Sequence, residues 1–168
     1  MALHEGKEPV DVDLLDSLAS GHRSVRRIID ELKSSAANDK EYLFGKLQAA
    51  YLRCAELEEK NFYRKMEEYR EVAGLIYDAM ADHEVIRELL QQLERLDPDS
   101  GRWRTKLELL DETFEAHAER EEHQVFPVAA RLLPERALHL MVEQLREEQE
   151  EGAQTRRHRH PVGPGRRT

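Results

Sequence analysis

A histidine and a glutamate lie four residues apart inside a stretch whose other inward positions are apolar. His117 and Glu121 share one face of a helix, because residues four apart in sequence are neighbours on a helix surface. The same face carries five apolar side chains: Leu107, Leu110, Phe114, Val125 and Val128. Burying an imidazole and a carboxylate in an apolar stripe is costly unless a partner compensates their polarity. A metal ion is one such partner, and a hydrogen bond between the two side chains is the alternative for an isolated pair.

Apolar residues recur at helical spacing along most of the chain and predict an all-α fold. Short polar connections separate the helical stretches, such as the Asp-Pro-Asp-Ser-Gly turn at 97–101. We expect helices over residues of about 11–33, 39–69, 72–93, 103–133 and 134–145. Gly74 is expected to mark the bend between the second and third helices, and Pro127 to bend the fourth. The predicted architecture is an antiparallel four-helix bundle with a short fifth C-terminal helix.

The composition agrees with a single helical domain. The 168 residues are enough to bury an apolar core, and 39% of them are hydrophobic while 36% are charged. That balance is typical of a bundle with charged outer faces, and no internal repeat is evident. We expect a flexible N-terminus at residues 1–10, the bundle at 11–151 and a basic disordered tail at 152–168.

The chain is acidic except at its C-terminal end. The net formal charge is -9, and the stretch from Ala153 onward holds five arginines and no acid, which leaves -14 for the rest. An acidic body argues against a broad nucleic-acid-binding surface. No apolar run approaches the ~18 residues of a membrane span, and the N-terminus lacks the apolar core of a signal peptide. A single cysteine excludes an internal disulfide, which fits a reducing compartment. Together these features predict a cytoplasmic protein without membrane or nucleic-acid partners.

Each of the four main predicted helices carries at least one ionisable residue on its apolar face. These residues are His22, Glu58, His83, His117 and Glu121. Because they lie near mid-length on their helices, they can converge on one point of the bundle core, which unrelated structural histidines have no reason to do. Three imidazoles and two carboxylates are more polar groups than a single small ion requires. They suit two metal ions bridged by Glu58 and Glu121.

Four short motifs resemble those of the haemerythrin-like (HHE cation-binding) family over residues of about 13–133. They are Ser20-Gly21-His22, Glu58-Glu59 followed by Phe62-Tyr63, Asp82-His83-Glu84, and the block from His117 to Phe126-Pro127. The resemblance implies that His22 is a terminal ligand of one iron ion and that His83 and His117 bind a second. It also implies that Glu58 and Glu121 bridge the two ions. Manganese, zinc or a mixed pair fit the same ligands.

Cys54 departs from the family pattern, which has a histidine four residues before the glutamate of the second helix. The cysteine side chain is much shorter, and a slightly longer metal–sulfur bond does not make up the difference. Three alternatives follow: Cys54 binds as a thiolate to an ion that moves towards the second helix, it leaves an open coordination position for water or substrate, or the first metal position is weak or empty. Tyr51, one turn earlier, either hydrogen-bonds an oxygen ligand of the metal or is an aromatic core residue.

The resemblance implies two classes of function, because family members bind dioxygen, consume peroxide, act as oxidases, or sense iron, oxygen or nitric oxide. In the first class the chain is a redox enzyme that acts on dioxygen or peroxide, with a small-molecule substrate entering beside Cys54. In the second class it is a non-enzymatic sensor or binding protein. We expect no signalling domain beyond the basic tail, and this favours the enzyme.

Overall fold

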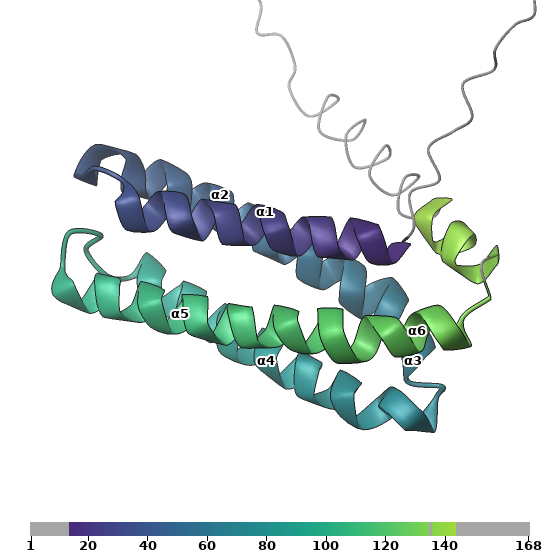
Figure 1. Cartoon of the computed structure of the whole chain (residues 1–168). Coiled ribbons are helices and arrows are strands. Elements are labelled where there is room, and N and C mark those ends of the chain that lie inside the picture. The colour runs from purple at the N-terminus through teal and green to yellow at the C-terminus, as the bar shows by residue number, and fades with distance from the viewer. Residues whose placement is uncertain (1–13, 135, 144–168) are drawn as a thin grey trace, which may run out of the picture.

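The computed structural model describes residues 14–134 and 136–143, which form helices joined by short turns (Figure 1). The elements are α1 (Leu14–Ser34), η1 (Ala37–Asp39), α2 (Lys40–Leu57), η2 (Glu58–Tyr63), α3 (Arg64–Met66), α4 (Arg70–Glu94), α5 (Gly101–Arg120), η3 (Glu121–Val125) and α6 (Phe126–Leu132). Residues 136–143 are helical as well. No strand occurs among the described residues, and the predicted all-α class is confirmed.

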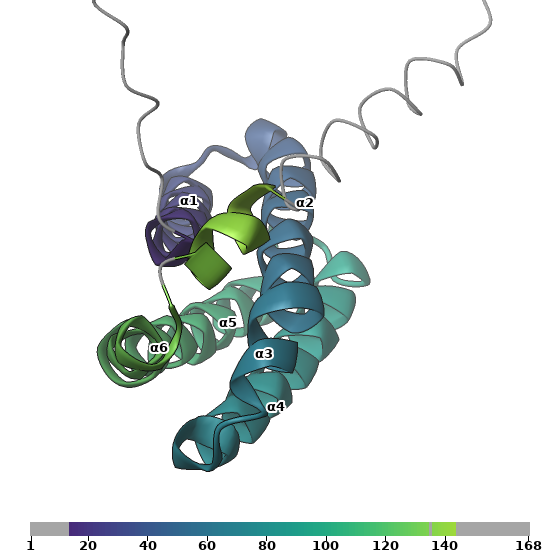
Figure 2. The same ribbon diagram turned by 90° about the vertical axis from the view of Figure 1, so that its right-hand side faces the viewer.

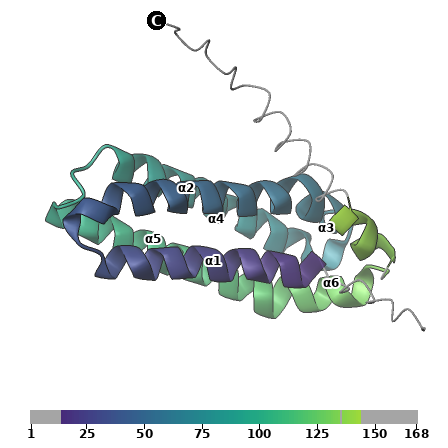
Figure 3. The ribbon, with the colours of Figure 1, turned by 90° about the horizontal axis from the view of Figure 1, so that it is seen from above.

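Four helical rods make up the bundle: α1, the run α2–η2–α3, α4, and the run α5–η3–α6. α1 packs against α2, α4 packs against α5, and α5 also contacts α1 (Figures 1 and 2). Consecutive rods run in opposite directions, as the view from above shows for α1 and α2 (Figure 3). The helix of residues 136–143 lies across one end of the bundle (Figure 2), where Leu138, Met141 and Val142 pack against its core.

Two apolar clusters fill the bundle, one towards each end. Val25 and Phe114 belong to the first cluster, and Leu18 and Phe62 to the second. The inward polar residues lie between the clusters, and on α1 His22 falls between Leu18 and Val25. The buried polar groups therefore form a layer across the middle of the bundle, covered by apolar side chains on both sides.

Two of the rods contain a π-helical segment, and each segment begins with a pair of glutamates. η2 begins with Glu58 and Glu59, and η3 begins with Glu121 and Glu122. π-helical turns are rare, and they occur frequently at functional sites. Pro127 follows η3 in the first turn of α6, where its missing N–H costs little. The irregularity in this rod therefore precedes the proline.

The predicted bend at Gly74 is wrong, because the chain reverses at residues 67–69, between α3 and α4. Met66 and Val72, one on each side of the reversal, are both fully buried in the same apolar cluster. Tyr69 provides it with an extended backbone, at φ -105° and ψ 111°. Gly74 lies inside α4 with open space where a Cβ would be, so it costs only helix propensity.

The helices of the described ranges include none that is long and apolar enough to cross a membrane. The predicted N-terminus at 1–10 and the predicted basic tail at 152–168 lie outside the described residues, as does the end of the predicted fifth helix at 144–145.

Candidate metal centre

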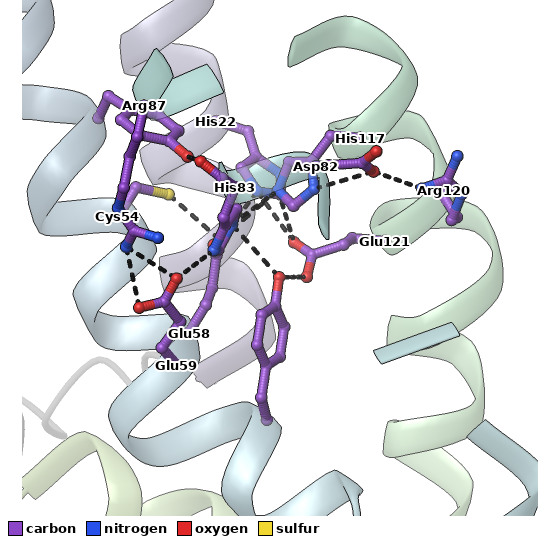
Figure 4. A network of polar contacts seen from close by, with 12 residues as sticks. His22, Cys54, Glu58, Glu59, Asp82, His83, Arg87, His117, Arg120 and Glu121 are labelled. Atoms are coloured by element: carbon purple, nitrogen blue, oxygen red, sulfur yellow. Dashed lines mark hydrogen bonds and ion pairs between the residues drawn. The ribbon is translucent and has the colours of Figure 1, made fainter. Parts of the chain in front are cut away.

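The five inward polar residues expected from the sequence meet in the layer between the two apolar clusters (Figure 4). Each of them is at most 1% exposed: His22, Glu58, His83, His117 and Glu121. One nitrogen or oxygen atom from each of His22, Glu58, His117 and Glu121 lies within 4.8 Å of the others. The Nε2 atom of His83 lies 3.3 Å from His117 Nε2 and so joins the same centre. Residues from four rods thus form one compact cluster of potential metal ligands.

The two carboxylates lie between the imidazoles. Glu58 Oε1 is 3.0 Å from His22 Nε2, and its other oxygen, Oε2, is 3.0 Å from His83 Nε2. Glu121 Oε2 is 3.2 Å from His22 Nε2 and 3.7 Å from His117 Nε2. Each carboxylate therefore faces two histidines of different rods, which is the placement that a group shared between two ions needs.

Three further carboxylates approach the opposite nitrogens of the same histidines. His22 Nδ1–H donates to Glu122 Oε1 at 2.9 Å, and His83 Nδ1–H donates to Glu59 Oε1 at 2.7 Å. Asp82 Oδ2 lies 3.7 Å from His117 Nδ1. Since Nδ1 carries the proton in the first two contacts, the Nε2 atoms of His22 and His83 are the ones available to a metal ion.

Electrostatics at the centre favour positive charge beside the Nε2 atoms. Burial by itself lowers the pKa of His22, but hydrogen bonds with Cys54, Glu121 and Glu58 outweigh it and raise the pKa far above its ordinary value. Burial is likewise outweighed at His83, where Glu58 raises the pKa. At Glu58 burial raises the pKa, but His22 and His83 lower it overall. The carboxylates thus favour positive charge at His22 and His83, and a bound cation would also supply such charge.

The polar atoms of the centre fit a metal ion. Within the described part of the chain, Glu121 Oε2 and His117 Nδ1 are buried without a hydrogen-bond partner. The ion-pair contacts of Glu121 Oε2 are with the Nε2 atoms of His22 and His117, and a bound cation would give this buried carboxylate oxygen a direct partner. Imidazole nitrogens and carboxylate oxygens are ligands of iron, manganese and zinc.

Sequence spacing missed the outer carboxylates, and the expectation for Glu59 is corrected. As the neighbour of the inward Glu58, Glu59 is predicted by α-helical spacing to lie towards solvent, but its side chain is only 30% exposed and bonds His83. Glu122 bonds His22 in the same way from η3. The two consecutive glutamates at the start of each π-helical segment are the sequence signal, since the first acid enters the centre and the second turns to a histidine of a neighbouring rod.

Tyr63 is a second group that spacing alone did not single out. Its hydroxyl donates to Glu121 Oε1 and lies 3.5 Å from His83 Nε2. Tyr63 follows Glu58 by five residues. On an α-helix the two side chains would point in different directions, but on a wider π-helix they point towards the same side. Burial raises the pKa of Tyr63 strongly, so the hydroxyl keeps its proton.

Tyr51 packs its ring edge-on against His83, and its hydroxyl bonds the main chain of that residue. Its hydroxyl donates to the carbonyl oxygen of His83 at 3.2 Å, and its ring packs edge-on against Phe114. These contacts favour the aromatic core reading of Tyr51 over hydrogen bonding within the centre.

Cys54 lies at the edge of the centre, next to Glu58. Its thiol donates to Glu58 Oε1 at 3.2 Å, and the residue is 5% exposed. Burial raises the pKa of Cys54 to about 12, so the metal-free protein holds it as a thiol. A Cβ atom added to Gly21 would lie 3.0 Å from the sulfur, which shows how closely α1 approaches it.

The fold and the cluster define an all-α, metal-binding helical domain. Residues 13–129 match the model of the hemerythrin HHE cation binding domain. The chain therefore belongs to the hemerythrin HHE cation-binding family. No curated protein matches it.

Proposed function

We propose that the centre holds two iron ions and that the protein is a non-haem di-iron oxidoreductase acting on dioxygen or peroxide. The observation that carries the proposal is the placement of Glu58 and Glu121, since each carboxylate faces two histidines from different rods. Three imidazoles and two carboxylates in one cluster are more donors than a single small ion requires, and this favours two ions.

The proposed ligands divide into two positions. His22 belongs to the first position, with Cys54 beside it, and His83 with His117 belongs to the second. Glu58 and Glu121 are shared. Manganese, zinc or a mixed pair are compatible with the same set of donor atoms.

A redox-active metal pair would supply electrons to dioxygen or peroxide. The chain contributes the surroundings of that chemistry. Apolar clusters on both sides exclude water from the layer, and the hydroxyl of Tyr63 holds a proton next to Glu121. Cys54, in the place where the family has a histidine, remains a thiolate ligand, a small residue that leaves a position for substrate, or the mark of a weak first position.

The test of the proposed function combines metal content with turnover. Chain loaded with ferrous iron without oxygen should contain two ions per chain and, with an added chemical reductant that returns the iron to the ferrous state, consume dioxygen or peroxide in excess of its iron. The Glu121→Ala variant should lose both the metal and the consumption. Wild-type chain that binds dioxygen or nitric oxide reversibly, with no consumption, would instead make it a sensor or binding protein.

A further inference from the structure

An arginine is paired with each of the three carboxylates that approach a histidine Nδ1 atom. Arg87 Nη2 lies 2.8 and 2.9 Å from the two oxygens of Glu59. Arg26 Nη1 donates to Glu122 Oε1 at 2.9 Å. Arg120 Nη1 donates to Asp82. These arginines are 25–34% exposed, so the ion pairs lie between the buried centre and the surface.

The three sets have the same construction. In each one the histidine and the arginine belong to one rod, three or four residues apart, and the carboxylate comes from a neighbouring rod. We name them by their histidines: the His22 relay (His22, Glu122, Arg26), the His83 relay (His83, Glu59, Arg87) and the His117 relay (His117, Asp82, Arg120). The carboxylate thus receives two partners from the rod opposite, and Figure 4 shows the arrangement for His83 and His117.

The order of groups in a relay has a definite physical effect. An acceptor at Nδ1 keeps the proton on that nitrogen and leaves the Nε2 lone pair for a metal ion. The arginine fixes the carboxylate and keeps it charged, because a guanidinium is always protonated and pairs well with carboxylate oxygens.

We propose that Glu59, Glu122 and Asp82, each held by its arginine, are positioning residues that aim the three histidines at the centre and set its affinity for metal. The proposal rests on metal binding by the centre and does not depend on which metal or reaction is involved. It assigns a role to acids and arginines that would otherwise count as ordinary surface ion pairs.

The relays are unequal. The contacts to His22 and His83 are 2.9 and 2.7 Å long, whereas His117 Nδ1 lies 3.7 Å from Asp82 and has no hydrogen-bond partner in the described ranges. Loss of Asp82 should therefore weaken metal binding less than loss of Glu59 or Glu122.

The test uses zinc, a diamagnetic ion that binds nitrogen and oxygen donors. Zinc affinity of the full chain is measured by competition with a chromophoric chelator. Glu59→Ala and Glu122→Ala should each weaken zinc binding by ~10- to 100-fold, the usual effect of losing such a partner. Asp82→Ala should weaken zinc binding less than either of these two variants. Glu71→Ala is the matched control, because it breaks an exposed ion pair with Arg131 that touches no histidine.

Proton NMR of the zinc-loaded chain separates positioning from a general loss of packing. The Nδ1–H of His83 should give a slowly exchanging resonance in the wild type. Glu59→Ala should lose this resonance, whereas Glu59→Gln should keep it, because the amide oxygen still accepts the bond. Glu59→Gln should also have a zinc affinity between those of the wild type and Glu59→Ala.

The outcomes distinguish the two proposals. If Glu59→Ala binds zinc as tightly as the wild type and keeps the resonance, the relay proposal is wrong. If Glu59→Ala does not fold, the variants Glu59→Gln and Arg87→Met replace it in the test. Zinc affinity equal to that of the wild type in both of these variants would also overturn the relay proposal. A wild-type chain that binds neither zinc, iron nor manganese would overturn the metal centre itself and with it the proposed function.

Discussion

The two helix pairs of the bundle, α1 with α2 and α4 with α5, carry their polar residues in the same order. His22 of α1 is followed four residues later by an arginine, and so is His83 of α4. The next rod of each pair then brings two glutamates at the start of a π-helical segment. The parallel is confined to a few positions, which is why the sequence shows no evident repeat.

The pairs differ at one corner of the centre. Four residues before its two glutamates, the α5 rod has His117, and the α2 rod has Cys54. The residue that precedes the histidine of the partner rod differs as well: Asp82 lies near His117, whereas Gly21 lies against Cys54. A long imidazole with a carboxylate behind it thus corresponds to a short thiol packed against a glycine. We therefore expect the two halves of the centre to be unequal as metal positions.

The largest expected effect comes from removing a residue that both halves share. Glu58→Ala should lose all bound metal, because Glu58 faces His22 with one oxygen and His83 with the other. Metal analysis after dialysis measures this, with the exposed Glu56→Ala as control. Full occupancy in Glu58→Ala would contradict the shared role.

His117→Cys tests the comparison by making the second half resemble the first. The second metal position would retain one imidazole instead of two, so we expect about one ion less per chain than in the wild type. The measurement is metal content per chain, together with far-UV circular dichroism to verify folding. Unchanged metal content in folded protein would mean that His117 is dispensable.

Cys54→His makes the opposite change and should raise the metal content towards two ions per chain where the wild type contains fewer. Metal titration of both proteins under the same conditions is the measurement. The same ratio of metal to protein in both, below two, would show that a histidine at position 54 adds no ligand to the centre.

The smallest effect concerns the close approach of α1 to Cys54. Gly21→Ala places a methyl group 3.0 Å from a buried sulfur that is bonded to Glu58, and overpacking of this kind costs roughly 1–3 kcal/mol. Gly74→Ala, at a helical position with open space, should stabilise the protein by about 0.5–1 kcal/mol. Urea unfolding of the metal-free proteins measures both.

The double variant Gly21→Ala/Cys54→Ala provides the control for this contact. Removing the sulfur should recover part of the stability lost in Gly21→Ala, beyond what adding the two single effects predicts. Strict additivity would mean that the glycine and the cysteine do not interact.

Helical spacing was sufficient to select the residues that form the centre. His22, Glu58, His83, His117 and Glu121 each interrupt an apolar stripe, and the 3.6-residue period assigns a residue to the inner face without knowledge of the other helices. The all-α class follows from the same regularity. Both conclusions depend on local geometry, which the sequence itself carries.

Tertiary structure decided what surrounds those residues. Glu59 and Tyr63 face inward because the backbone widens into a π-helix after Glu58, and no spacing rule for α-helices anticipates that change. The chain reverses at residues 67–69, with Met66 and Val72 buried in one cluster on either side, and the local signal at Gly74 did not indicate this position. The pairing of each outer carboxylate with a histidine and an arginine of another rod depends on how the rods pack together. A period read along one helix identifies which side faces inward, but only the packed bundle determines which residue lies opposite.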